Sequence, residues 1–368
     1  MILIILFLSF KIFAQNFVVD DYNYPLSVLT DNNKNIEVKK GYKILPGTII
    51  KTEGEHYGII KYTNLCEIYI KPKTILKFNK IDLTNKIIQI YVNGSIYFKN
   101  FQTETNQEFY IFISTRFVNF KVKLASFLMN DLNNKLNISL FNDNLIAEFN
   151  NHIYFFDPVI KRISLDNKLV LQIYDAPKDL NSGYGIQFFQ GGDEIGISFA
   201  PLKPDLEFPE NKSIITKGVN LVWKKKELKG IKKPEFDEKK YKIKWLDSDE
   251  NFYRIEIAKD EKFLNFVKIV ETSKNFLNID DLEDGKYFWR VINIDKNNNI
   301  ESLPSEVNSF TLQKPKEILV IKKKEDKANI EKIVEEDYGK QGIPKENKVA
   351  AGIWGSMLFF TFLILVII

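Results

Sequence analysis

Cysteine and histidine are scarce in this chain of 368 residues, which contains one cysteine, Cys66, and two histidines, His56 and His152. A single cysteine excludes an intrachain disulfide framework. The two histidines lie far apart in the sequence, with no cysteine or acidic residue at the spacing of a metal motif. We therefore expect both histidines to be ordinary surface residues. Cys66 lies in the strand-like run 64–70 and is expected to be a small buried hydrophobe.

Motifs of catalysis and nucleotide binding are also absent from the sequence. It has no P-loop, no Gly-x-Ser-x-Gly elbow and no glycine-rich dinucleotide fingerprint. The net charge of +4 is nearly balanced, and no sustained basic patch alternates with aromatic residues, which argues against nucleic-acid binding. The acidic pairs Asp20–Asp21 and Asp280–Asp281 are expected in solvated turns. The sequence thus predicts no enzyme, no catalytic, cofactor-binding or metal-binding residue, no cofactor and no nucleic-acid partner.

One segment has part of the spacing of a calcium loop. Asp295, Asn297, Asn299 and Glu306 fall at positions 1, 3, 5 and 12 of the EF-hand pattern. Position 6 is Ile300, where that loop needs glycine, and strands rather than helices are expected on both sides. We interpret the segment as a polar turn between strands, with a calcium loop as the alternative.

Charged side chains are missing from residues 350–368. At about 1.5 Å per residue, a helix over this range would be roughly 28 Å long, enough to cross the hydrocarbon core of a bilayer. Ala351 and Gly355, with Gly352 and Ser356 beside them, form small-x-x-x-small pairs that permit close helix packing, although a span also tolerates small residues for no such reason. We predict a single transmembrane helix over 350–368.

The N-terminal residues indicate a secretory route. Residues 1–13 are apolar apart from Ser9 and Lys11, and a polar chain follows Ala14. This pattern predicts a signal peptide over 1–14, although no Lys or Arg precedes its apolar core. A buried N-terminal strand and an uncleaved anchor are the alternatives.

The lysines near the C-terminus leave two membrane orientations open. Export by the signal peptide would place the body of the protein outside the cytoplasm. Lys340, Lys345 and Lys348 precede the predicted helix and no basic residue follows Ile368, so the positive-inside rule favours a tail-anchored protein instead. Large domains translocate largely regardless of charge. We therefore expect a single-pass protein of the cell inner membrane with its body in the periplasm.

The region 38–180 has the pattern of an all-β domain. Short runs rich in Ile, Tyr, Phe and Val are separated by Asn, Asp, Gly and Lys at intervals of roughly ten residues, and no long amphipathic helix is indicated. Predicted strands include 57–62, 67–70, 87–92 and 109–113. Asn93–Gly94, between two such runs, predicts a two-residue β-hairpin.

The order of these signals resembles that of FecR-like domains. The segments that carry the resemblance are Gly41 to Thr48 with Thr52, Ile70 to Phe78, Ile90 to Phe98, and the strand pair 109–115 and 118–127. Two departures are that residues 124–127 replace the family's Gly-Thr-x-Phe signature and that Arg116 replaces a proline. The resemblance implies a FecR-like β domain over 38–180. Signalling members of the family contact a sigma factor through an N-terminal cytoplasmic region, for which the predicted signal peptide leaves no room, so we do not expect anti-sigma signalling.

The region 201–313 resembles a fibronectin type III-like sandwich. After an extended linker from Pro201 to Pro209, the residues that carry this resemblance are Trp245, Tyr253, Leu282, Gly285, Tyr287, Trp289 and Val291. The resemblance implies that Trp245 packs in the core of the sandwich. Strand alternation places Tyr287, Trp289 and Val291 on one face and Phe288, Arg290 and Ile292 on the other.

The segment 314–348 is rich in Lys and Glu and is expected to be a charged, solvated stalk. Its apolar stripe of Ile330, Ile333 and Val334 is narrow, and a helix that forms with a partner is the alternative. The combination of signal peptide, FecR-like domain and fibronectin type III-like domain resembles cell-envelope proteins of spirochaetes.

The expected architecture is an all-β protein, with a FecR-like β domain and an immunoglobulin or fibronectin type III-like sandwich, that ends in a transmembrane helix. The expected function is that of a membrane-tethered, non-catalytic cell-envelope protein whose β domains bind a protein or an envelope polymer. The alternative is an accessory subunit of a membrane enzyme or transport complex, with the tail helix packed on a partner.

Overall fold

The computed structural model describes residues 17–29, 34–62, 65–102, 109–132, 134–159, 161–172, 183–226, 234–248 and 252–315. The predicted signal peptide, almost all of the stalk and the predicted helix over 350–368 lie outside these residues. Within the described ranges, no helix is long and apolar enough to cross a membrane. The chain divides into two compact units, the larger comprising Met1–Ser213, Asn220–Ile279 and Lys286–Phe310, and the smaller Ile214–Val219, Asp280–Gly285 and Thr311–Ile368.

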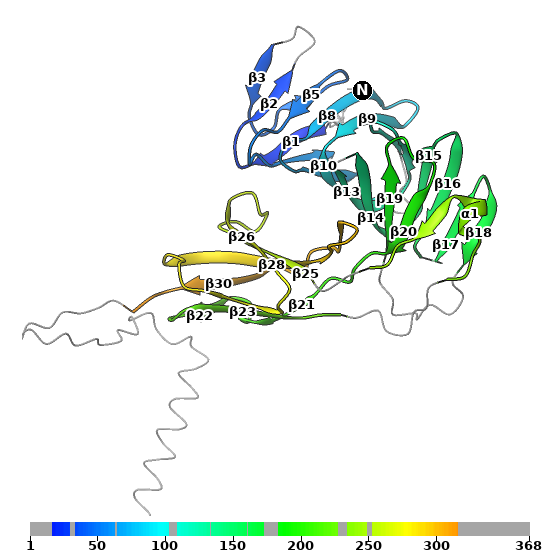
Figure 1. Cartoon of the computed structure of the whole chain (residues 1–368). Helices are drawn as coiled ribbons and strands as arrows, with labels where there is room; N and C mark the ends of the chain where they lie inside the picture. Colours follow the sequence, from blue (N-terminus) through cyan, green and yellow to red (C-terminus); the bar gives the residue numbers. More distant parts are fainter. Residues whose placement is uncertain are drawn as a thin grey trace, which may run out of the picture. The chain divides into compact units, whose positions relative to one another are not determined.

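A ten-stranded sheet forms one layer of the larger unit (Figure 1). Its strands run in the order β24 (Ile243–Trp245), β20 (Ile195–Phe199), β19 (Tyr184–Phe189), β14 (Lys135–Asn142), β13 (Ser126–Leu132), β10 (Ser95–Asn100), β7 (Cys66–Ile70), β6 (Gly58–Tyr62), β1 (Phe17–Tyr22) and β4 (Lys43–Ile44). Neighbouring strands are antiparallel, except that β20 and β24 are parallel.

An eleven-stranded sheet forms the second layer. Its strands run in the order β18 (Lys168–Gln172), β17 (Arg162–Leu165), β16 (His152–Asp157), β15 (Leu145–Phe149), β12 (Asn119–Val122), β11 (Tyr110–Ser114), β9 (Ile87–Asn93), β8 (Ile75–Asp82), β5 (Ile49–Lys51), β2 (Leu26–Leu29) and β3 (Asn35–Val38). The pair β9–β11 is parallel and the other pairs are antiparallel.

Aromatic side chains join the two sheets into one core. Phe17 of the ten-stranded sheet lies with its ring centroid 4.9 Å from that of Phe78 in the eleven-stranded sheet. Phe188 likewise meets Phe149 across the layers at 5.3 Å and Phe120 at 5.8 Å. All five side chains are buried, and tilted or edge-on ring pairs at these distances add to the hydrophobic stabilisation of the core. Along the strands of both sheets, the apolar residues that alternate in the sequence therefore face the shared core, and the residues between them face outward.

The predicted hairpin at Asn93–Gly94 is wrong. β9 pairs with β8 and β11, whereas β10 pairs with β7 and β13, so the chain passes from one sheet to the other at this point. Gly94 has a φ of 126°, and an added Cβ would lie 2.7 Å from Cα of Thr74. The Thr74 hydroxyl accepts from the Ser95 N–H at 2.9 Å. Glycine is thus required here for a close crossing between sheets rather than for a two-residue turn.

The remaining strands form two smaller sheets. One has the order β21 (Asp205–Phe208), β23 (Val219–Lys224) and β27 (Phe276–Ile279), and the other contains β22 (Ser213–Ile215), β25 (Phe252–Ala258), β26 (Phe266–Thr272), β28 (Gly285–Asp295), β29 (Ile300–Glu301) and β30 (Asn308–Leu312). Trp223 of β23 packs edge-on against Tyr253 of β25 at 5.5 Å, and both are buried. The two sheets therefore share a core in the manner of a β-sandwich.

The tryptophan that packs in this sandwich core differs from the predicted one. Trp245 lies in β24, which pairs with β20 of the ten-stranded sheet, and its ring meets Phe199 edge-on at 5.2 Å. The interpretation of Trp245 as a sandwich residue is wrong, and Trp223 takes that place. The predicted alternation along β28 is confirmed, because Tyr287, Trp289 and Val291 are buried to 1% exposure or less.

The described chain is all-β with several antiparallel sheets. Its one described helix is the short α1 (Glu238–Tyr241), whose first turn is capped by the Asp237 side chain. The predicted strands near 57–62, 67–70, 87–92 and 109–113 are present as β6, β7, β9 and β11.

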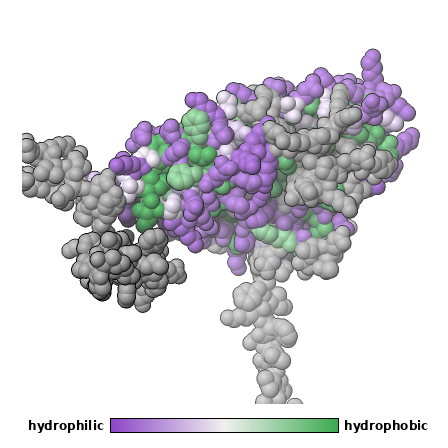
Figure 2. Space-filling model, turned by 90° about the horizontal axis from the view of Figure 1, so that it is seen from below, coloured by the Kyte–Doolittle hydropathy of each residue, from purple (hydrophilic) through white to green (hydrophobic). Residues whose placement is uncertain are grey.

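The domain boundaries remain a prediction, and the strands β1 to β3 lie largely before residue 38. On the face shown in Figure 2, hydrophilic residues cover most of the described surface, and hydrophobic ones form separate patches.

Candidate functional site

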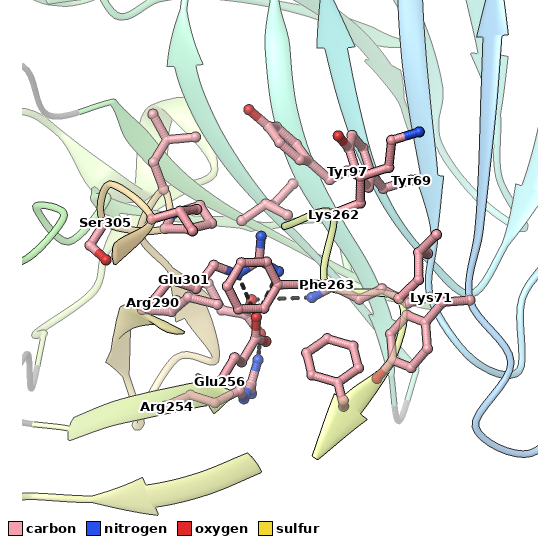
Figure 3. Close-up of a pocket in the computed structure, with 18 of the residues that line it drawn as sticks. Tyr69, Lys71, Tyr97, Arg254, Glu256, Lys262, Phe263, Arg290, Glu301 and Ser305 are labelled. Carbon is pink, nitrogen blue, oxygen red and sulfur yellow. Dashed lines mark hydrogen bonds and ion pairs between the residues drawn. The ribbon is translucent and has the colours of Figure 1, made fainter. Parts of the chain in front are cut away.

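A cavity of about 500 Å³ lies within the larger unit. One wall comes from β6, β7 and β10 of the ten-stranded sheet, and the facing wall comes from β25, β26, β28 and the segment 301–307. Tyrosines, phenylalanines and charged side chains line it together, as Figure 3 shows. Its volume falls in the range of roughly 300–1,000 Å³ that is usual for small-molecule sites.

Glu301 is the centre of a buried ion cluster at one side of the cavity. Its carboxylate accepts from Arg254 Nη1 at 2.8 Å and from Lys71 Nζ at 3.2 Å. Asn130 Nδ2 lies 3.5 Å from the same carboxylate, and the Glu301 backbone N–H donates to the Ser139 hydroxyl at 3.2 Å. The cluster therefore ties residues of the ten-stranded sheet to β25 and β29 (Figure 3).

The charges of this cluster are held in their ionised forms. Burial disfavours the ionised Glu301 carboxylate, but the charges of Lys71 and Arg254 outweigh burial and lower its pKa to about 2. Burial likewise disfavours the Arg254 cation, and the carboxylates of Glu301, Glu256 and Glu271 raise its pKa above the usual value. Glu301 and Arg254 therefore do not exchange protons near neutral pH, which makes them unsuited to general acid–base catalysis.

A second ion pair, between Arg290 and Glu256, lies on the wall formed by β25 and β28. Arg290 Nε and Nη2 lie 2.7 Å and 2.6 Å from Glu256 Oε2. The Arg290 guanidinium also lies over the Phe263 ring, 3.9 Å from its centroid. Arg290 belongs to the face of β28 opposite Trp289, so strand alternation buries one face in the sandwich core and turns the other toward the cavity.

Tyrosines supply much of the aromatic lining. Tyr69 of β7 and Tyr97 of β10 are directly opposed in the antiparallel pair, with centroids 5.8 Å apart and ring planes 27° apart. Tyr57 meets the Phe266 ring at 4.9 Å. Burial raises the pKa of Tyr57 and of Tyr69 to about 12, and that of Tyr97 above its usual value. The three phenols therefore remain protonated, so that each keeps a hydroxyl donor.

The acidic pair near the end of β1 belongs to this region rather than to a solvated turn. Lys262, which lines the cavity, donates to Asp20 Oδ2 at 2.9 Å and to Asp21 Oδ2 at 2.8 Å. Burial lowers the pKa of Lys262, but the hydrogen bonds to Asp21 and Asp20 outweigh it and raise the pKa. The expectation that Asp20 and Asp21 lie in a turn is wrong, because both belong to β1, whereas Asp280 and Asp281 are exposed.

Small residues allow β29 to pack on the ten-stranded sheet beside the cavity. An added Cβ on Gly185 of β19 would lie 2.5 Å from Cδ1 of Ile300. Gln187 lies on the same face of β19 as Gly185, and its side-chain amide donates to the Asn298 carbonyl at 2.5 Å. β19 and β20 are buried on both faces, which explains their nearly unbroken apolar sequence.

The scarce cysteine and histidines lie away from the cavity lining. Cys66 is fully buried, as predicted, and burial raises the pKa of its thiol. His56 stacks on Tyr24 at 4.8 Å. His152 Nδ1 lies 2.8 Å from Asp166 Oδ2, and Asp166 also accepts from the Ile153 N–H. Both histidines are partly exposed, and the ranges that the structure describes contain no group of three or more His, Cys, Asp or Glu suited to a metal ion.

The residues of the calcium-like pattern are held in other contacts. Asp295 is buried at the end of β28, where its carboxylate accepts from the Asn298 amide at 2.7 Å. Asn297 and Asn299 are exposed in the turn between β28 and β29. Glu306 is exposed and pairs with Lys203. The segment is a turn between strands, as we interpreted it.

Comparisons with known proteins give matches to solved structures only, since no protein-family model and no curated protein matches the chain. The chain is similar to a candidate anti-sigma factor from Parabacteroides distasonis ATCC 8503, with 12% identity, a TM-score of 0.31, and coverage of 41% of this chain and 59% of that one. It is similar to the fibronectin type III domain of human fibronectin type III domain containing protein 3, with 22% identity, a TM-score of 0.22, and coverage of 32% of this chain and 90% of that one.

A third match is the extracellular domain of BT4673, a candidate one-component system from B. thetaiotaomicron, with 12% identity, a TM-score of 0.19, and coverage of 77% of this chain and 53% of that one. The chain thus spans 59% of the anti-sigma factor candidate and about half of the BT4673 domain. The resemblance to FecR-like and fibronectin type III-like proteins has structural matches at low identity, and TM-scores this low assign no function.

Few features of the sequence indicate this site. Tyr69 and Tyr97 occupy outward-facing positions of predicted strands, which is a weak signal for an aromatic surface. Glu301 lies inside the calcium-like pattern but is not one of its four matching residues, and its partners Lys71 and Asn130 are remote in the sequence. Chemically, the site combines aromatic rings with fixed hydrogen-bonding groups, which suits recognition of a ligand.

Proposed function

We propose that the chain is a non-catalytic binding protein, held at a membrane by residues 350–368, whose β domains bind a protein or a polymer of the cell envelope. A FecR-like part over 38–180 and a fibronectin type III-like part over 201–313 would then be carried on the stalk 314–348. The body would lie in the periplasm.

The observation that carries this proposal is the chemistry of the cavity. Its central carboxylate, Glu301, and the neighbouring Glu256 are held in ion pairs with Arg254, Lys71 and Arg290. A general acid or base needs a pKa near the working pH, whereas the Glu301 pKa is about 2. Aromatic side chains and fixed polar groups provide contact surface and orientation, which are the requirements of binding.

Two measurements test the parts of this proposal. Epitope tags at both ends, followed by protease treatment of intact cells and spheroplasts, report the side of the membrane. Digestion of the body in spheroplasts but not in intact cells supports the periplasmic location, and protection in spheroplasts overturns it.

Binding is tested by crosslinking in intact membranes and by co-sedimentation of the full chain with isolated envelope polymer. Recovery of a periplasmic protein or of envelope polymer supports the proposal. Crosslinks solely to integral membrane proteins through 350–368 would favour the accessory-subunit function instead.

A further inference from the structure

We propose that the cavity between Tyr69, Tyr97, Phe263 and Arg290 binds a short segment of a neutral saccharide. This inference rests on the proposed binding function and deepens it by naming the ligand class. It combines three observations, which are the aromatic lining, the ion pairs that hold most of the charged side chains, and the hydrogen-bonding groups left within those pairs.

The aromatic lining offers rigid amphipathic contacts on both walls. Tyr69 and Tyr97 lie side by side on the wall formed by the ten-stranded sheet (Figure 3). Phe263 and Phe266 line the facing wall, with centroids 6.2 Å apart. Tyrosine gives a large contact area with few rotatable bonds, so little conformational entropy is lost on binding. The carbon-bound hydrogens on the faces of a sugar ring pack well against such rings.

The charges of the lining disfavour a strongly charged ligand. Lys71 and Arg254 share the Glu301 carboxylate, and Arg254 also pairs with Glu271. Arg290 pairs with Glu256. Lys262 and Lys203 pair with carboxylates as well. An anionic or cationic ligand would have to compete with these existing partners, and a broken buried pair leaves an uncompensated charge. A neutral ligand leaves the pairs intact.

The ion pairs keep unused hydrogen-bonding capacity that matches sugar hydroxyls. A guanidinium has five N–H donors in a fixed fork, and a carboxylate has about four acceptor sites, so the Arg290–Glu256 pair retains both donors and acceptors. Within the described residues, the Tyr97 hydroxyl makes no hydrogen bond, and that of Tyr69 makes one long contact of 3.5 Å with Glu67. Each sugar hydroxyl both donates and accepts, and neighbouring hydroxyls can bridge such adjacent groups.

The test is titration calorimetry of the full chain in detergent with three neutral probes, triacetylchitotriose, cellotriose and maltotriose. We expect at least one probe to bind. Tyr97→Ala is expected to weaken this binding by about tenfold, the effect of losing one aromatic contact, and Tyr69→Ala by a similar factor. Tyr97→Phe, which removes only the hydroxyl, should have a smaller effect.

The matched control is Tyr110→Ala, which truncates a tyrosine 40% exposed on β11 of the other sheet. This variant should leave probe binding unchanged, and near-ultraviolet circular dichroism of each variant checks that the fold is retained. Absence of binding by all three probes overturns the inference, as does binding that Tyr97→Ala and Tyr69→Ala leave unchanged. Binding of an uncharged hexapeptide that the saccharides do not displace also overturns it.

A parallel co-sedimentation with envelope polymer separates this inference from the proposed function. If the unaltered chain co-sediments and the tyrosine variants do so equally well, the cavity inference fails while the binding function stands. If the chain binds a saccharide probe through the tyrosines but neither sediments with polymer nor crosslinks to a periplasmic protein, the site stands and the proposed envelope function fails.

Discussion

The side chain of Ile300 lies directly over Gly185, so closely that a Cβ on residue 185 would be 2.5 Å from Cδ1 of Ile300 and 2.7 Å from the Ser198 hydroxyl. Real Cβ atoms essentially never approach other atoms this closely. The contact brings β29 onto the ten-stranded sheet and thereby places Glu301 beside Ser139 and Lys71. The geometry of the candidate site therefore depends on the absence of a side chain at residue 185.

We predict that Gly185→Ala destabilises the protein by about 1–3 kcal/mol, because the added methyl group displaces Ile300 from a well-packed position. Urea unfolding of the variant and the unaltered chain measures the difference. Gly192→Ala is the control, since its Cβ would meet nothing closer than Phe189 Cβ at 3.1 Å, and its cost should stay below about 1 kcal/mol. Equal stabilities of the two variants would contradict the prediction.

Glu301→Gln is expected to cost about 3–5 kcal/mol of unfolding free energy, because it removes the buried negative charge that Lys71 and Arg254 share. Chemical denaturation at neutral pH provides the measurement. Glu306→Gln removes a carboxylate from an exposed pair with Lys203 and should cost less than about 1 kcal/mol. A loss for Glu301→Gln no larger than that of Glu306→Gln would show that the buried cluster contributes little.

The pH dependence of stability should carry the signature of Glu301. Its folded-state pKa of about 2 lies below its ordinary value of 4.5, so its contribution is present above pH 4.5 and is lost as the pH falls toward 2. The contribution is on the order of 3 kcal/mol. Urea unfolding at a series of pH values from 7 to 3 should therefore show a steeper loss for the unaltered chain than for Glu301→Gln. Parallel profiles would contradict this assignment.

Cys66 should be unreactive in the folded protein. It is fully buried, and burial raises the pKa of its thiol, whereas the thiolate is the reactive form. We expect no reaction with an aromatic disulfide reagent in native buffer and one thiol per chain in urea. Ser248→Cys places a second thiol at an exposed position and should react at once. Rapid reaction of Cys66 in native buffer would mean that the ten-stranded sheet opens readily.

Local sequence patterns were enough to predict the class of the fold and many strands. β7, β9 and β11 alternate between buried and more exposed residues, and the same alternation along β28 separates Trp289 from Arg290. These features follow from the two-residue period of a strand, which a short window of sequence contains.

Features set by distant partners were not predicted. Asn93–Gly94 has the local chemistry of a hairpin, yet β10 pairs with β7 and β13 because those strands bury its apolar face. Trp245 matches a sandwich pattern, yet its strand β24 pairs with β20. The two strands are distant in the sequence, and no local pattern links them. The Glu301 cluster joins residues that are up to 230 positions apart, and no spacing rule covers such a separation.

The crossing at Gly94 makes one continuous stretch of chain, from Ile87 to Asn100, a member of both large sheets. Because only Gly94 separates β9 from β10, neither sheet can shift or detach without displacing the other. A force applied to one sheet would be transmitted directly to its partner through this shared strand. The two layers should therefore unfold as one cooperative body, a useful property for a domain expected to bind while tethered.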